Sequence, residues 1–190
     1  MINGDQAERL NYWLEGRYKV LFQLAVESGL RISDLLNLRV KDIASRMTVY
    51  ETKSRRKRTF TISHELLRDL SYLTDCKINS DYVFQSERDS KKHVHRSTIH
   101  RQIKKALKWL DFDASAHSAR KLYAKTIFNE SGSVECVQRA LNHQKLSTTF
   151  AYLDIPQQNE PEEEKDATKK PKNIIGKIKD WFHRMFTKKP

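Results

Sequence analysis

His117-Ser118-Ala119-Arg120 is followed along the chain by Leu141-Asn142-His143 and then by Ser147-Thr148-Thr149-Phe150-Ala151-Tyr152. Upstream of these stretches, Arg31 lies in the segment 28–36 and Lys53 precedes a strongly basic run. The chain therefore carries Arg, Lys, His-x-x-Arg, His and Tyr in this order. A single His-x-x-Arg is weak evidence, whereas five elements in one order form a specific signal whose test is the structural context.

The residue types suggest chemistry on a phosphate group. Planar guanidinium groups bind phosphate oxygens in a bidentate manner. A tyrosine hydroxyl, with an unperturbed pKa of about 10, needs a nearby base and positive groups that stabilise charge on the phosphate oxygens. Its attack would give a covalent phosphotyrosyl bond that stores the energy of the broken bond. Resealing would then need no cofactor, metal or ATP, which fits a sequence without a Walker loop or a zinc-type cysteine pair.

The same motifs resemble the catalytic domain of the tyrosine recombinases, the phage integrase family, over residues 5 to 155. The resemblance implies a mainly helical α+β fold with a small antiparallel β-sheet. It also implies that Arg31 and Arg120 clamp the scissile phosphate. Tyr152 would attack phosphorus and leave a 3′-phosphotyrosyl bond and a free 5′-hydroxyl group. Asn142 stands where the family most often has glycine, and asparagine also accepts a left-handed backbone.

The resemblance assigns the remaining catalytic roles. Lys53 would donate a proton to the leaving 5′ oxygen, as a general acid. His117 would accept the tyrosine proton, because its near-neutral pKa suits transfer in both directions. His143 would hydrogen-bond a non-bridging oxygen. Asp34 would orient Arg31 or the loop of His117, or it would simply be an acid at a helix start, where the helix dipole favours it.

Length and charge limit the classes of protein to which the chain could belong. At 190 residues the chain is long enough for one domain with a sizeable core. A formal net charge of +12, located mostly in residues 1–155, indicates a polyanionic partner such as nucleic acid. Cys76 and Cys136 are too few for a disulfide framework and favour the reducing cytoplasm. No apolar run is long enough to predict export or membrane spanning.

Periodic patterns predict the order of elements. We expect an opening helix with a capping box of Asp5 and Glu8, a second helix that ends near Gly29, and a short helix from Ser33 or Asp34. Segments 46–51 and 58–63 predict a β-hairpin with Lys53 at its tip. Further helices are predicted at residues 64–73, 97–110, 117–129, 134–141 and 148–153.

Basic residues outside the motifs are candidates for DNA contacts. They fall on the predicted hairpin, on the loop around residue 92 and on the helix after it. His93, His95 and His100 superficially resemble metal ligands, but basic neighbours and the lack of a further ligand favour a DNA-facing loop, so no metal is predicted. The candidate DNA-binding residues are Arg55, Arg56, Lys57, Arg58, Lys91, Lys92, Arg96, Arg101, Lys104 and Lys105.

Composition divides the chain into three parts. Residues 1–155 form the predicted catalytic domain, 156–172 an acidic-to-basic disordered linker, and 173–190 a basic amphipathic helix. That helix would dock on protein, in cis or on a neighbouring protomer, or on an anionic membrane surface. Most of the family has an additional N-terminal helical domain that completes a clamp around DNA. Here the sequence is a minimal recombinase, or a part of a longer protein, or it depends on an accessory DNA-binding protein.

The leading functional hypothesis is site-specific recombination of double-stranded DNA, as integration, excision or inversion by a mobile genetic element. The resemblance implies a homotetramer assembled on DNA. Two alternatives remain at this point. One is a type IB topoisomerase or telomere resolvase, which shares the chemistry. The other is a catalytically silent DNA-binding regulator, which the complete set of catalytic residue types disfavours.

Overall fold

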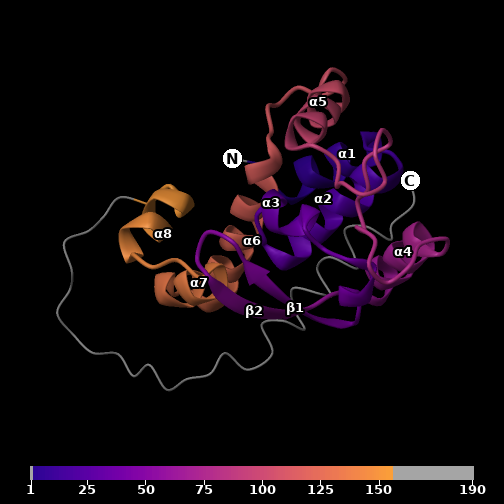
Figure 1. Cartoon of the computed structure of the whole chain (residues 1–190). Helices are drawn as coiled ribbons and strands as arrows, with labels where there is room; N and C mark the ends of the chain where they lie inside the picture. The colour runs from indigo at the N-terminus through magenta and orange to yellow at the C-terminus, as the bar shows by residue number, and fades with distance from the viewer. Residues whose placement is uncertain (1, 156–190) are drawn as a thin grey trace.

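The computed structural model describes residues 2–155 of the chain, and these form a mainly helical domain with one two-stranded antiparallel sheet. This confirms the predicted fold class. The predicted linker and C-terminal helix lie outside the described residues. Figure 1 shows the elements, which are α1 (Gly4–Trp13), α2 (Gly16–Ser28), α3 (Ile32–Leu36), η1 (Val40–Asp42), β1 (Arg46–Glu51), β2 (Arg56–Thr61), α4 (His64–Thr74), α5 (Arg96–Leu107), α6 (Ala116–Ser131), α7 (Val134–Leu141) and α8 (Leu146–Leu153).

The central element is α2. Every residue from Val20 to Ser28 is buried, which is typical of a helix surrounded by others. It contacts α1, α3, α4 and α6. Figure 1 shows α6, α7 and α8 grouped on one side of the molecule, where each contacts the other two, whereas α5 lies beside α1. Among residues 2–155, the helices lack the length and apolar character that a membrane span requires.

The ends of the first two helices test the capping predictions. The expected capping box of Asp5 and Glu8 is wrong, because α1 begins earlier than expected. Asn3 accepts a hydrogen bond from the Gln6 backbone at 2.8 Å, and Gln6 accepts one from the Asn3 backbone. The predicted stop of α2 is confirmed. Gly29 adopts a left-handed conformation with φ of 61°, and a Cβ there would clash with the Tyr123 ring.

The hairpin forms as predicted, with its second strand shifted. β2 begins at Arg56 rather than at residue 58 and pairs with β1 so that Val49 faces Arg58. The turn of residues 52–55 carries Lys53 at the tip and closes on Arg55 with φ of 54°. Burial alternates along β1, which places Met47, Val49 and Glu51 on the inner face. This alternation brings a carboxylate into the interior of the domain.

Candidate active site

Four segments distant in sequence bring Arg31, Arg120, His143 and Tyr152 together. Arg31 is the N-cap of α3, and its side chain is partly exposed. Arg120 lies in the second turn of α6 and is 2% exposed. His143 follows α7, whose end requires the left-handed conformation that Asn142 adopts with φ of 52°. Tyr152 lies in the last turn of α8, and its ring centroid is 5.3 Å from that of His143.

Arg120 is held by backbone carbonyl groups. Its Nη1 donates to the Gly29 carbonyl, and its Nη2 donates to the Leu141 carbonyl at 2.8 Å. Burial lowers the pKa of Arg120 to about 10, and the charges of Arg31 and Arg58 act in the same direction. The guanidinium group therefore remains charged at neutral pH. Because it joins the ends of α2 and α7, Arg120 has a fixed position before any substrate arrives.

A buried carboxylate that the sequence motifs do not reveal lies among the arginines. Glu51 is fully buried, and its oxygens lie 3.5 Å from Arg31 Nη1, 3.4 Å from Arg58 Nη1 and 3.8 Å from Arg120 Nη1. Ser54 Oγ donates to Glu51 Oε2 at 2.7 Å. Burial raises the pKa of Glu51, but the Ser54 hydrogen bond and the three arginines outweigh it and lower the pKa below its ordinary value. Glu51 is therefore ionised at neutral pH.

Arg58 requires a correction. The basic run after Lys53 predicts a DNA contact for it, but the side chain is 7% exposed and faces the interior. It donates to the carbonyl groups of Ser28 and Gly29, and its guanidinium carbon lies 5.3 Å from the centroid of the Tyr123 ring. The physical reason is strand alternation, since Arg58 shares the inner face with Phe60. The same alternation in 46–51 and 58–60 was the signal that could have identified both Glu51 and Arg58.

His143 is buried and neutral. Burial lowers its pKa to about 4, and the charges of Arg120 and Arg31 act in the same direction. Arg120 Nη2 lies 3.5 Å from Nε2 of His143, while Nδ1 lies 3.0 Å from Thr149 Oγ1. Arginine can only donate, so Nε2 is the acceptor and Nδ1 carries the proton that it donates to Thr149. Thr149, which is fully buried, thereby fixes the orientation of the imidazole.

Tyr152 is half-buried beside this cluster. Burial raises the pKa of the Tyr152 hydroxyl, and the positive charges of Arg120 and Arg31 oppose the increase. The phenol is therefore protonated at neutral pH and needs a base before it can act as a nucleophile. His117 is exposed at the start of α6, and its Nε2 lies 3.5 Å from Arg96 Nη2. Partial desolvation by the surrounding residues and the charges of the neighbouring arginines lower the pKa of His117, so its neutral form can accept a proton.

Among the described residues, two predicted site residues form no side-chain hydrogen bond or ion pair with the arginines of the cluster, and both are connected with the hairpin turn. Lys53 is exposed in the hairpin turn, and within residues 2–155 its side chain has no hydrogen-bond or ion-pair partner. Asp34 is buried, and its predicted role of orienting Arg31 or the loop of His117 stays a prediction. Its Oδ1 accepts a hydrogen bond from the Thr52 backbone at 3.1 Å, because β1 ends beside α3. Asp34 therefore fixes the turn that carries Lys53.

The other candidate DNA-binding residues are exposed, and their contacts with DNA stay a prediction. α5 buries Ile99 and Ile103 against the domain and turns its basic side chains to the surface. Arg96 differs from the rest in its contact with His117. Within the described part of the chain, no group of three or more His, Cys, Asp or Glu residues is placed to hold a metal ion. The exposed candidates are Arg55, Arg56, Lys57, Lys91, Lys92, Arg96, Arg101, Lys104 and Lys105.

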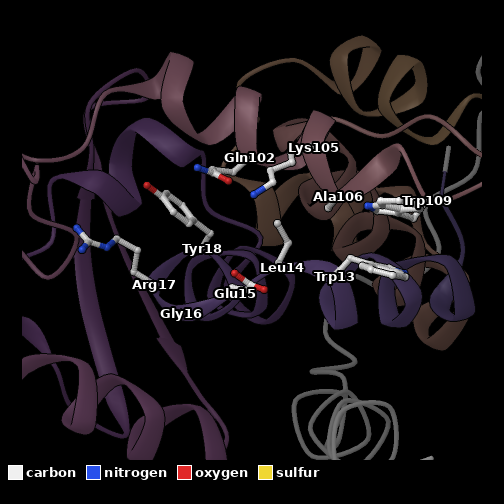
Figure 2. Close-up of a pocket in the computed structure, with 10 residues that line it drawn as sticks. All are labelled: Trp13, Leu14, Glu15, Gly16, Arg17, Tyr18, Gln102, Lys105, Ala106 and Trp109. Carbon is white, nitrogen blue, oxygen red and sulfur yellow. The ribbon is translucent and has the colours of Figure 1, made fainter.

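A separate hollow of about 410 Å³ lies between the turn joining α1 to α2 and the face of α5 (Figure 2). Trp13 and Trp109 form one wall, and their stacked rings lie 5.7 Å apart with an angle of 17° between their planes. Glu15, Arg17 and Lys105 contribute its charged groups. None of the predicted catalytic residues lines this hollow, so it is distinct from the arginine cluster.

Comparison with known sequences identifies the family. The chain matches the model of the Phage integrase family over residues 1–159. A tyrosine recombinase of Thermosipho africanus is 34% identical over 161 residues, which cover 82% of this chain and 54% of that protein. The probable integrase/recombinase YoeC of Bacillus subtilis is 31% identical over 139 residues, which cover 71% of this chain and 76% of that protein. Among the first relatives, this chain mostly spans about half the relative's length.

Comparison with solved structures agrees on the fold. The crystal structure of XerA recombinase matches with a TM-score of 0.68 and 24% identity, over 80% of this chain and 58% of that one. The crystal structure of a lambda integrase dimer bound to a COC′ core site matches with a TM-score of 0.63 and 19% identity, over 86% of this chain and 62% of that one. With the family model and relatives above 30% identity, these matches establish that the chain belongs to the phage integrase family.

Proposed function

We propose that this protein is a site-specific recombinase that cuts and rejoins double-stranded DNA through a 3′-phosphotyrosyl intermediate. The observation that carries the proposal is the convergence of Arg31, Arg120 and His143 on the same end of α8 as Tyr152. Two guanidinium groups suit the oxygens of a phosphodiester, the neutral imidazole of His143 accepts from Arg120, and the tyrosine supplies the nucleophile. Membership of the family supports the same activity.

The proposed reaction assigns one step to each group. Arg31 and Arg120 bind the non-bridging oxygens of the scissile phosphate and stabilise the charge that develops there. His117 accepts the proton of the Tyr152 hydroxyl as its oxygen forms a bond to phosphorus. The bond from phosphorus to the 5′ oxygen breaks, and Lys53 donates a proton to that oxygen. Attack by a 5′-hydroxyl of another strand reverses these steps and releases the tyrosine.

DNA as the substrate is supported by charge and by the relatives. The whole chain carries a net charge of +12, and exposed lysines and arginines lie on the hairpin turn and on α5. Structural neighbours include XerH bound to its difH substrate and a lambda integrase tetramer bound to a Holliday junction. By analogy we propose that this protein acts as a homotetramer, in which strands from two duplexes can exchange.

The experiment traps the covalent intermediate on DNA of random sequence, so the target site need not be chosen beforehand. The protein is incubated with a pool of nicked half-site duplexes of randomised sequence, in which the short fragment that carries the released 5′-hydroxyl diffuses away after cleavage. Adducts that survive denaturation are collected and their DNA is sequenced. We expect adducts with the wild-type protein and with Tyr50→Phe, which changes an exposed strand tyrosine. Tyr152→Phe should give none, because only the nucleophilic oxygen is lost.

Three outcomes would change the proposal. Adducts that persist with Tyr152→Phe would move the nucleophile to another residue. Adducts that form while two duplexes carrying the recovered site never exchange strands, even though supercoiled plasmid is relaxed, would favour a type IB topoisomerase. Absence of any adduct alongside tight DNA binding would favour the silent regulator.

A further inference from the structure

The carboxylate of Glu51 is a feature of the site to which the proposed reaction gives no step. It is fully buried at the end of β1, and three guanidinium groups and one hydroxyl group surround it. Removing a carboxylate from water is costly unless it is paired and hydrogen-bonded, and both conditions are met here. The negative charge of Glu51 therefore depends on the three arginines, and the carboxylate in turn attracts their guanidinium groups.

The three arginines differ in how much else holds them. Arg58 donates to the carbonyl groups of Ser28 and Gly29, and Arg120 to those of Gly29 and Leu141. For Arg31, Glu51 is the one side-chain hydrogen-bond or ion-pair partner among residues 2–155. Arg31 is also the most exposed of the three arginines, with 19% of its side chain accessible. The orientation of Arg31 therefore depends on Glu51 far more than that of Arg58 or Arg120.

Charge balance gives Glu51 a second effect. Three guanidinium groups and one carboxylate carry a net charge of +2. Without the carboxylate, the guanidinium groups would repel one another at short range in a poorly hydrated site. Arg31, the most exposed of the three, would then turn toward water. A phosphodiester carries one negative charge and gains a second as the nucleophile adds, so a net +2 matches the charge of the transition state.

We propose that Glu51 is a positioning residue that holds Arg31 toward the scissile phosphate and keeps the arginine cluster at a net charge of +2. This inference rests on the proposed function for its catalytic consequence, but its structural part does not need DNA. Ser54 extends the arrangement, because its hydroxyl group holds the Glu51 oxygen nearest to Arg31 at 2.7 Å. The hairpin turn that carries Lys53 is thereby connected to the orientation of Arg31.

The first measurement uses the free protein. Nitrogen-15 NMR of the arginine side chains, assigned by single Arg→Lys substitutions, reports how rigidly each guanidinium group is held. In Glu51→Gln we expect the Arg31 group to become mobile while the groups of Arg58 and Arg120 stay ordered. Glu15→Gln removes the same charge from an exposed position and should change none of them. Unchanged order of Arg31 in Glu51→Gln would overturn the inference.

The second measurement uses the half-site recovered with the wild-type protein. At saturating protein, single-turnover cleavage by Glu51→Gln should be about 100-fold slower, the size of effect that follows loss of one oriented charge-stabilising donor. DNA affinity should change less than about twofold, since exposed residues hold the phosphate backbone. In an Arg31→Ala background, Glu51→Gln should slow cleavage far less, because Glu51 acts through Arg31. A full additional loss of about 100-fold in that background would contradict positioning.

Failure to fold and failure of the proposed function give different results. If Glu51→Gln unfolds, Ser54→Ala removes one hydrogen bond and leaves the charge in place. It should loosen Arg31 and slow cleavage by about tenfold, the effect of about 1.4 kcal/mol on the barrier. Equal loosening of Arg58 and Arg120 would contradict the inference. If the wild-type protein never forms an adduct but Arg31 loosens selectively, the proposed function is wrong and the positioning by Glu51 stands.

Discussion

The site has two parts that differ in how the protein holds them. The buried cluster consists of Glu51, Arg58, Arg120 and His143, all less than 9% exposed and joined by hydrogen bonds or ion pairs. The exposed rim consists of His117 and Lys53 together with Arg96, all on the surface. The first part is continuous with the hydrophobic core, whereas the second part is attached to it through a turn and two helix starts.

This difference indicates a division of labour. Groups that stabilise developing charge are most effective when they are oriented before the reaction, because no reorganisation is then needed. Burial among backbone carbonyls provides that orientation for Arg120. Groups that move protons or contact DNA must reach a substrate that arrives from solvent, so they remain accessible. Substitutions in the buried cluster should therefore lower both the unfolding free energy and the cleavage rate. Substitutions in the exposed rim should change the cleavage rate or DNA binding and leave the unfolding free energy nearly unchanged.

The largest effect is expected for Arg120→Ala. It removes the donors that join Gly29 to Leu141 and leaves the carboxylate of Glu51 with one arginine fewer. Breaking a buried charge pair costs about 3–5 kcal/mol of unfolding free energy. Loss of one clamp should also slow cleavage by about 1,000-fold. Arg96→Ala, on the exposed rim, should change the unfolding free energy by less than about 0.5 kcal/mol. Urea unfolding measures the stability of the two variants, and single-turnover cleavage measures their rates. Equal stability of Arg120→Ala and Arg96→Ala would refute the distinction between the buried cluster and the exposed rim.

A large effect on cleavage alone is expected for Lys53→Ala. Removal of a general acid slows a reaction by about 100- to 10,000-fold, while an exposed turn residue contributes little to stability. A substrate with sulfur at the 5′ bridging position has a leaving group that needs no proton, and it should restore the rate. Lys57→Ala is the matched control on the same hairpin. Rescue of Lys57→Ala in place of Lys53→Ala would move the proton donor along the hairpin.

The same division explains what the sequence could predict. The order of Arg31, Arg120, His143 and Tyr152 predicted that they converge, because the sequence around each of them resembles a motif of the phage integrase family. Glu51 and Arg58 lie at inward strand positions where apolar residues are expected, and their partners come from several distant segments of the chain. The ion pair between Glu51 and Arg58 depends on how β1 and β2 are aligned. The predicted start of β2 at residue 58 did not give this alignment, because β2 begins at Arg56 and Val49 lies opposite Arg58.

Local ambiguity accounts for the smaller errors. Asn3 with Gln6 and Asp5 with Glu8 both fit a capping box, and α1 forms the first. Asp34 lies in the first turn of α3 as its sequence position indicated, but its partner is the Thr52 backbone. Such a partner comes from a different segment of the chain. Side-chain identities near Asp34 could not have revealed it.

An intermediate effect on the stability of the folded protein is expected when pH falls. The pKa of His143 is lowered to about 4 in the folded protein, below its ordinary value of 6.5. Between these values the unfolded chain binds a proton that the folded protein does not bind, so stability is lost as pH falls from 6.5 toward 4. His143 accounts for at most about 2 kcal/mol between about pH 7 and about pH 5.

Urea unfolding at these two pH values tests this expectation. His143→Asn can still donate to Thr149 and should lose less stability than the wild-type protein on acidification. His117→Asn is the matched change on the exposed rim and should alter the pH dependence less. If both variants and the wild-type protein lose equal stability, burial of His143 does not determine its protonation.

The smallest effect is expected from the exposed basic residues of α5. Each phosphate contact releases condensed counterions, so the logarithm of DNA affinity falls linearly with the logarithm of salt concentration. Lys104→Ala should reduce that slope by about 1 and leave the unfolding free energy unchanged. A mixed-sequence duplex suffices as a probe, because phosphate contacts carry no sequence information. Lys19, exposed on α2 outside the predicted DNA surface, provides the control, and its replacement by alanine should leave the slope unchanged. An equal loss of slope for both lysines would mean that the charge of the whole domain, rather than the face of α5, attracts DNA.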